Sequence, residues 1–288
     1  MAIQGLEQRL VAAQYIADAP LVTALQLLAD MKRPLLLEGD AGVGKTEVAK
    51  ALAAVFACPL IRLQCHEGLD INQAAYEWNY QRQLLAIQIA AVRGGVEEAS
   101  LFSREFLLKR PLLQAIDTTG PVVLLIDEVD RADEEFEAYL LEALSDFQIT
   151  IPELGTIHAH TTPYVVLTSN GTRELSDALR RRCLYYYLEY PSPDKELAIV
   201  NCRLPGIGTR LASEVVRFVH GLRGLDLRKT PGISETLDWA AALMAKGASR
   251  LESVEDLDQT LICLLKTRED RRTVDANVVR GLVGAQSP

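Results

Sequence analysis

The segment from Gly39 to Thr46, with the sequence GDAGVGKT, limits the fold of this chain more than any other feature. It consists of a glycine, four residues and then Gly-Lys-Thr, and it follows the short apolar run Leu35 to Leu37. In this pattern the glycines turn backbone N–H groups toward phosphate oxygens, and a helix that begins near Lys45 points its positive end at them. A chance glycine turn is the alternative. The residues expected to contact a nucleotide are Gly39, Asp40, Ala41, Gly42, Val43, Gly44, Lys45, Thr46 and Glu47.

Two adjacent carboxylates, Asp127 and Glu128, follow the continuous apolar run Val122 to Ile126. Neighbouring strand ends would bring them to the phosphate-binding loop. Lys45 is then expected to reach the β- and γ-phosphates, and Thr46 and Asp127 to hold Mg²⁺, partly through water. Glu128 is placed to act as the general base on an attacking water molecule. The alternative is an acidic pair that only ends a strand at the surface.

Asn170 is a further polar candidate, because it follows the apolar run Tyr164 to Thr168. Its amide could orient the attacking water, although an asparagine before glycine is usually a turn residue. Three arginines come next along the chain, in the segment ALRRRC from Ala178 to Cys183. They form either a solvated helix face or the source of an arginine that enters the site of an adjacent subunit. We select Arg182 among the three.

Apolar runs alternate with helical patterns over the first two thirds of the chain, which predicts a parallel sheet in a three-layer α/β/α arrangement. The predicted strands are Leu35–Leu37, Leu60–Gln64, Val122–Ile126 and Tyr164–Thr168. A helix is expected over Asp18 to Met31, with Pro20 near its start. After Tyr190, glycines separate helical patterns only. We therefore expect an α/β domain over residues 1–190 and a small all-helical domain over residues 191–288.

Two stretches depart from this alternation. Residues 71–106 are rich in Gln and Ala and predict helical pieces that project from the sheet layer. Residues 147–159 predict a β-hairpin, because isoleucines alternate with polar residues around Pro152 and Gly155.

A few side chains in these stretches have two interpretations. His158 and His160 are ordinary exposed strand residues or half of a metal site, of which only two ligands are visible. Trp78 and Tyr80 are expected to pack against the protein rather than to stack on nucleic-acid bases. Five cysteines occur without a CxxC pair and are interpreted as small core residues in a reducing compartment, namely Cys58, Cys65, Cys183, Cys202 and Cys263.

Composition excludes several classes of protein. Hydrophobic residues make up 49% and charged residues 24% of the 288 residues, as in ordinary globular proteins. The net charge of −9 argues against a large basic surface for nucleic acid or anionic membranes. No apolar run reaches the roughly 18 residues that cross a bilayer, and the first residues do not form a signal-peptide core. A cytoplasmic protein without a transmembrane segment is expected.

The order of these motifs resembles that of AAA+ ATPases. The phosphate-binding loop, the Asp-Glu strand, the hairpin, the Asn-ended strand and the arginine cluster occur in the same order. Cys65 to Leu85, CHEGLDINQAAYEWNYQRQLL, and Phe106 to Ile116, FLLKRPLLQAI, are similar to the MoxR branch. Thr230 to Leu243, TPGISETLDWAAAL, most resembles the accessory ATPases that help mature molybdenum-containing carbon monoxide dehydrogenases.

The resemblance implies an AAA+ P-loop NTPase core with a C-terminal helical lid, and it implies ATP and Mg²⁺ as cofactors. It assigns nucleotide contacts to the loop from Gly39 to Thr46, metal and water activation to Asp127 and Glu128, sensing to Asn170, and a trans-acting arginine to Arg182. Residues 71–106 match the insertion in the second helix of this family. The hairpin over residues 147–159 precedes the first sensor, and both elements line the pore or touch clients in related rings.

The resemblance also implies a homo-oligomer, a hexameric ring, that acts as a chaperone on a client metalloenzyme. A von Willebrand A-type adaptor is an implied partner, nucleic acid is not, and any membrane association would run through partners. One position departs from the family, because Ser234-Glu235-Thr236 stands where many members carry a second-sensor arginine. Arg228 or Lys229 could take that role. A nucleic-acid remodeller and a nucleotide-gated assembly scaffold are the alternative functions.

Overall fold

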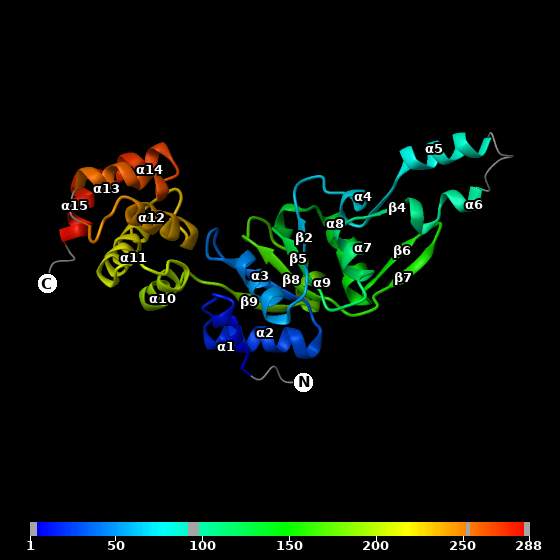
Figure 1. Ribbon diagram of the computed structural model, residues 1–288, viewed down its shortest axis with the longest axis horizontal. Coiled ribbons are helices and arrows are strands. Elements are labelled where there is room, and N and C mark those ends of the chain that lie inside the picture. Colours follow the sequence, from blue (N-terminus) through cyan, green and yellow to red (C-terminus); the bar gives the residue numbers. More distant parts are fainter. Residues whose placement is uncertain (1–4, 92–97, 252–253, 285–288) are drawn as a thin grey trace. The chain divides into compact units, whose positions relative to one another are not determined.

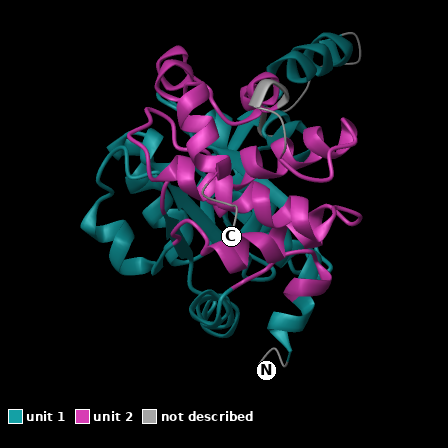
Figure 2. Cartoon of the chain, turned by 90° about the vertical axis from the view of Figure 1, so that its left-hand side faces the viewer, with its two compact units in different colours: residues 1–9, 18–38, 46–187 teal, residues 10–17, 39–45, 188–288 magenta. Residues whose placement is uncertain are grey.

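The computed structural model describes residues 5–91, 98–251 and 254–284. The chain divides into two compact units (Figure 2). The first, which we call the sheet unit, comprises residues 1–9, 18–38 and 46–187. The second, the helical unit, comprises residues 10–17, 39–45 and 188–288, and so includes most of the glycine-rich loop. The short helix α1 (Leu6–Ala12) contributes residues to both units.

A five-stranded parallel sheet forms the centre of the sheet unit (Figure 1). Its strand order is β2-β5-β8-β1-β9. The strands are β1 (Leu35–Glu38), β2 (Leu60–Gln64), β5 (Val123–Asp127), β8 (Tyr164–Ser169) and β9 (Leu184–Tyr187). All five residues of β5 are buried, as expected for an inner strand covered on both faces. The predicted parallel α/β fold is confirmed.

Helices precede or connect these strands. They are α2 (Ala19–Met31), α3 (Lys45–Phe56), α7 (Pro111–Ile116), α8 (Glu134–Ser145) and α9 (Asp177–Arg182), with a 3-10 turn, η2 (Val129–Arg131). The helix α2 begins where its sequence predicts, because the Asp18 carboxylate accepts a hydrogen bond from the Leu21 N–H at 3.0 Å.

The insertion between β2 and α7 is more regular than the sequence suggests. It contains α4 (Ile71–Ala74), β3 (Tyr76–Trp78), α5 (Tyr80–Ala91), α6 (Glu98–Leu101), η1 (Arg104–Phe106) and β4 (Leu107–Lys109). The antiparallel pair β3–β4, which was not predicted, closes its base. Trp78 is buried and meets Phe102 edge to face, with ring centroids 5.3 Å apart. The expectation that Tyr80 packs is wrong, since this residue is 61% exposed at the start of α5.

The predicted hairpin forms from β6 (Gln148–Ile151) and β7 (Gly155–His158), which pair antiparallel. Its alternating isoleucines are buried in the same core as the sheet, namely Ile149, Ile151 and Ile157. His158 is exposed, and His160 Nε2 lies 3.7 Å from Asp117 Oδ1. Within the described ranges, no three His, Cys, Asp or Glu side chains are grouped closely enough to hold a metal ion.

The helical unit contains α10 (Pro193–Arg203), α11 (Thr209–Arg223), α12 (Ile233–Ala245), α13 (Val254–Thr260), η3 (Leu261–Cys263), α14 (Arg268–Thr273) and α15 (Ala276–Gly284). Phe218 and Trp239 are fully buried in its core, with ring centroids 4.9 Å apart. The buried Glu196 carboxylate is paired with Arg223 at 2.6 Å, which compensates its charge.

The cysteines are only partly core residues. Cys65 and Cys183 are buried, and burial raises the pKa of each thiol to about 12, so both stay protonated. The other three, Cys58, Cys202 and Cys263, are half-buried, which corrects the expectation for them. Among the described residues, no helix combines the length and apolar character needed to span a membrane.

Candidate active site

The glycine-rich loop connects β1 to α3, and α3 begins at Lys45 as predicted. Gly42 and Gly44 adopt positive φ angles of 82° and 95°, which side-chain-bearing residues rarely adopt. Gly42 also lies close to Gly232 at the start of α12, where a Cβ atom on Gly42 would come within 2.9 Å of the Gly232 Cα. The Ile233 N–H donates to the Gly42 carbonyl at 2.9 Å. Glycine is therefore required at position 42 by both conformation and space.

Lys45 is 7% exposed, and its ammonium is turned toward the loop. Its Nζ donates to the carbonyl oxygens of Gly39 at 2.6 Å and of Asp40 at 2.8 Å. A buried ammonium at the first residue of a helix, beside a loop of glycines, fits the phosphate groups of a nucleotide.

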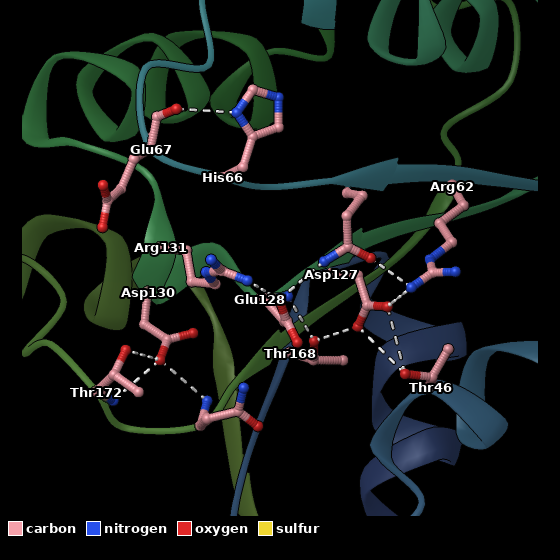
Figure 3. Close-up of polar contacts among 12 residues, drawn as sticks. Thr46, Arg62, His66, Glu67, Asp127, Glu128, Asp130, Arg131, Thr168 and Thr172 are labelled. Atoms are coloured by element: carbon pink, nitrogen blue, oxygen red, sulfur yellow. Dashed lines mark hydrogen bonds and ion pairs between the residues drawn. The ribbon is translucent and has the colours of Figure 1, made fainter. Parts of the chain in front are cut away.

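Thr46 and Asp127 meet where α3 begins and β5 ends (Figure 3). Thr46 Oγ1 lies 3.2 Å from Asp127 Oδ1 and 3.4 Å from Oδ2. Asp127 is 3% exposed, and Thr168 on the adjacent strand β8 donates to its Oδ1 at 2.5 Å. A hydroxyl and a carboxylate are hard oxygen donors of the kind that Mg²⁺ prefers, so these residues fit that ion.

Glu128 follows Asp127 in the left-handed conformation, with φ 56° and ψ 49°. This conformation is strained for a residue with a side chain, and such strain is concentrated at functional sites. The Glu128 N–H donates to Thr168 Oγ1 at 2.9 Å, which holds the turn. Its Oε2 accepts hydrogen bonds from Gln64 Nε2 at 3.0 Å and from Arg131 Nη1 at 3.2 Å.

Sequence reasoning missed Arg62, Gln64 and Thr168. Arg62 Nη2 lies 2.5 Å from Asp127 Oδ2, and both polar residues of β2 are exposed while Ile61 and Leu63 are buried. The signal was the alternation in Leu60–Gln64, which puts Arg62 and Gln64 on one face. The pairing of β2 with β5, which sets Gln64 opposite Asp127, is needed to show that this polar face lies at the candidate site.

Asn170 directly follows β8, and its N–H donates to Asp130 Oδ2 at 3.2 Å. Asp130 also accepts from the Thr172 hydroxyl at 2.6 Å and from the Thr172 N–H at 2.9 Å (Figure 3). Burial raises the pKa of Asp130, but the hydrogen bonds from Thr172 and Asn170 outweigh it, and the net pKa lies below the usual value. Asp130 thus ties the turn after β8 to the turn after β5.

The arginine cluster ends α9, as the sequence predicts. Arg182 Nε donates to Ser145 Oγ at 2.8 Å, and Arg180 Nη2 lies 3.2 Å from Glu38 Oε2. Arg181 has an 83% exposed side chain and lies 3.8 Å from Asp177. The contacts described for Arg182 do not include Thr46, Asp127 or Glu128 of its own chain.

In the helical unit, Glu235 occupies the first turn of α12, and its Oε2 accepts from the Gly232 N–H at 3.0 Å. It therefore caps the helix. Arg228 and Lys229 line a cavity of about 440 Å³, whose walls also include Ala41 of the glycine-rich loop. The two cations that the sequence offers in place of a second-sensor arginine thus lie beside the loop.

Residues 34–183 match the AAA domain family, dynein-related subfamily. The gas vesicle ATPase GvpN of Haloferax mediterranei is 23% identical over 249 residues, which cover 83% of this chain and 68% of GvpN. Protein NorQ of Paracoccus denitrificans is 24% identical over 279 residues, 93% of this chain and 90% of NorQ. A solved structure of a RuvB point mutant from Thermotoga maritima is similar in fold, with a TM-score of 0.52 and 19% identity over 92% of this chain and 80% of that chain.

The family match spans the sheet from β1 to the end of α9 and includes the phosphate-binding loop, β5 and β8. The matches to GvpN and NorQ extend the likeness beyond that region over most of the chain. The chain belongs to the AAA domain family, dynein-related subfamily, and it is an AAA+ ATPase of the MoxR type.

Proposed function

We propose that this protein hydrolyses Mg-ATP at a site shared by two subunits of a hexameric ring, and that it uses the cycle to remodel a client metalloenzyme or to help insert its metal centre. The observation that carries the proposal is the contact between Thr46 Oγ1 and Asp127 Oδ1, 3.2 Å apart, with Glu128 next along the chain. This contact brings together a hydroxyl and a carboxylate, the two candidate metal ligands, beside the candidate base at one end of the sheet.

The loop and the start of α3 bind the nucleotide in this proposal. Backbone N–H groups and the Lys45 ammonium contact the phosphates, and Thr46 and Asp127 hold Mg²⁺, partly through water. Mg²⁺, when bound, neutralises charge on the β- and γ-phosphates. The other contacting residues are Gly39, Asp40, Ala41, Gly42, Val43, Gly44 and Glu47.

Glu128 accepts the proton of the water that attacks the γ-phosphorus, while the bond to the leaving oxygen of ADP breaks. Gln64 and Arg131 hold the Glu128 carboxylate at 3.0 and 3.2 Å, so they position the base. Asn170 orients the water through its amide. The backbone of Asn170 is fixed by Asp130, which supports a constant place for that amide.

Arg182 acts in the site of the neighbouring subunit in this proposal. It ends α9 at an exposed position, which leaves its guanidinium accessible to a second copy of the chain. A guanidinium stabilises the charge that develops on the transferred phosphoryl group.

The client is a metalloenzyme of the molybdenum hydroxylase class, such as carbon monoxide dehydrogenase, with a von Willebrand A-type adaptor as a second partner. Several large apolar side chains of α5 support a protein-binding role, since Leu84, Leu85 and Ile89 are 60%, 55% and 49% exposed. The net charge of −9 disfavours nucleic acid as the substrate. We place the protein in the cytoplasm, with any membrane contact made through partners.

The test is to incubate an apo-form molybdenum hydroxylase with the protein and Mg-ATP, and to follow both ATP consumption and recovery of hydroxylase activity. We expect faster ATP hydrolysis with the client and activation that requires hydrolysis. ATP binding that suffices for activation would favour the scaffold function. Tight DNA binding that weakens steeply with salt would favour a nucleic-acid remodeller.

A further inference from the structure

Arg62 places its guanidinium on the carboxylate that we assign to the magnesium ion. Arg62 Nη2 lies 2.5 Å from Asp127 Oδ2, and it also donates to Gln64 Oε1 (Figure 3). The Arg62 side chain is 52% exposed, whereas that of Asp127 is 4% exposed. A partly solvated cation therefore covers a buried anion.

The fold explains how Arg62 reaches this position. β2 is an edge strand of the sheet, and Arg62 lies two residues before Gln64, which pairs with Asp127 of β5. Residues two apart on a strand share a face, so the long arginine side chain runs past Gln64 to the end of β5.

The groups around Asp127 determine the role of its contact with Arg62. Asp127 Oδ1 accepts from Thr168 and Thr46, and Asp127 Oδ2 accepts from Arg62. A buried carboxylate without a nearby cation is costly, and removal of one partner of such a pair leaves the charge uncompensated. A divalent ion bound through Asp127 needs the same oxygen lone pairs and the same negative charge. Arg62 and Mg²⁺ therefore compete for one carboxylate.

We propose that Arg62 is the resident counter-cation of Asp127, and that Mg²⁺ displaces it when Mg-ATP binds. This inference rests on the proposed Mg-ATP site. Arg62 is thus a positioning residue that sets how much Mg²⁺ the site requires. Because Arg62 also contacts Gln64, whose amide holds Glu128, its displacement changes the surroundings of the candidate base as the metal arrives.

The test is a magnesium titration of the binding of a fluorescent ATP analogue to the full chain, with the half-saturating Mg²⁺ concentration as the readout. Arg62→Gln and Arg62→Met, two neutral variants, should each lower that concentration about fivefold, because the competing cation is gone. Arg62→Lys keeps the charge and should stay within about twofold of the parental protein. Arg82→Gln is the matched control, since Arg82 is 54% exposed and pairs with Glu105 at 2.8 Å.

An unchanged or increased Mg²⁺ requirement in both neutral variants, with normal circular dichroism and normal nucleotide binding at saturating Mg²⁺, would overturn the inference. That result would leave the proposed function standing. Binding of the analogue by the parental protein without any dependence on Mg²⁺ would overturn the inference as well. If the parental protein does not bind the analogue even at saturating Mg²⁺, the proposed function fails and the inference fails with it.

Discussion

Asp130 and its donors show how single residues fix the shape of the site. The carboxylate accepts three hydrogen bonds from Asn170 and Thr172, and it joins two turns that follow different strands. Burial raises the pKa of Asp130, but the hydrogen bonds from Thr172 and Asn170 lower it by more, so the net pKa is depressed. A depressed pKa means that the folded state favours the ionised carboxylate. This stabilisation is fully present above the pKa of the carboxyl in the unfolded chain, about 3.9. It is lost as the pH falls through the folded-state pKa.

Thr172→Val should therefore lower the free energy of unfolding by about 1 kcal/mol at pH 7, because it removes the 2.6 Å hydrogen bond to Asp130. The difference from the parental protein should shrink as the pH falls from about 4 through the lower folded-state pKa of Asp130, where the native carboxylate becomes protonated. Urea unfolding at several pH values measures both effects. Thr23→Val is the control, since Thr23 bonds only within its exposed helix turn. A decrease in the free energy of unfolding that does not change with pH would show that the Thr172 hydroxyl does not stabilise the protein through the Asp130 carboxylate.

Among the elements, the hairpin β6–β7 is anchored in the core of the sheet unit by its buried isoleucines. Ile151 has no exposed surface, whereas Thr150 beside it is exposed and meets Thr156 across the hairpin at 3.0 Å. Ile151→Ala should cost about 2–5 kcal/mol of stability, because it removes buried methyl groups and leaves a cavity. Thr150→Ala should change stability by no more than about 0.5 kcal/mol. Denaturant unfolding of both variants measures these changes in the free energy of unfolding. Equally small changes in the two variants would mean that Ile151 does not anchor the hairpin in the core.

The elements that the sequence predicts best are those with the longest patterns. The apolar runs of β5 and β8, the helical spacing of α2 with Pro20 near its start, and the alternation of the hairpin are local signals, and each element forms. β9 was missed because its aromatic sequence alternates in burial and lies at the edge of a parallel sheet. The strands β3 and β4 were missed because each has three residues and because the rest of the insertion separates them along the chain.

The residues of the candidate site likewise divide into those that a local sequence pattern identifies and those that it does not. A contiguous motif identifies the glycine-rich loop, and an acidic strand end identifies Asp127 and Glu128. Arg62, Gln64 and Thr168 could not be found from the sequence, because their contacts depend on β2 and β8 lying on either side of β5. The order of strands in a sheet is a property of the folded chain and not of any one segment.

In the proposed ring, each complete site needs residues from two chains. Hydrolysis per subunit should therefore rise with protein concentration as the ring assembles. Arg182→Ala should lower hydrolysis by about 10³-fold or more. When Arg182→Ala and Lys45→Ala subunits are mixed, some activity should return, because one interface in the mixed ring then carries both an intact loop and an intact arginine. Failure to restore activity, despite co-assembly shown by size-exclusion chromatography, would exclude Arg182 as the trans-acting residue.

We expect Lys45 to bind the nucleotide and Glu128 to drive its hydrolysis. The most direct measurement compares nucleotide affinity and the rate of phosphate release for Lys45→Ala, Glu128→Gln and the parental protein under the same Mg²⁺ concentration. We expect Lys45→Ala to lose nearly all affinity, because it removes the buried ammonium at the loop. Glu128→Gln should bind ATP with parental affinity and release phosphate at least about 10²-fold more slowly, because only the base is lost. Parental turnover by Glu128→Gln would contradict the assignment of the base and the account of the site built on it.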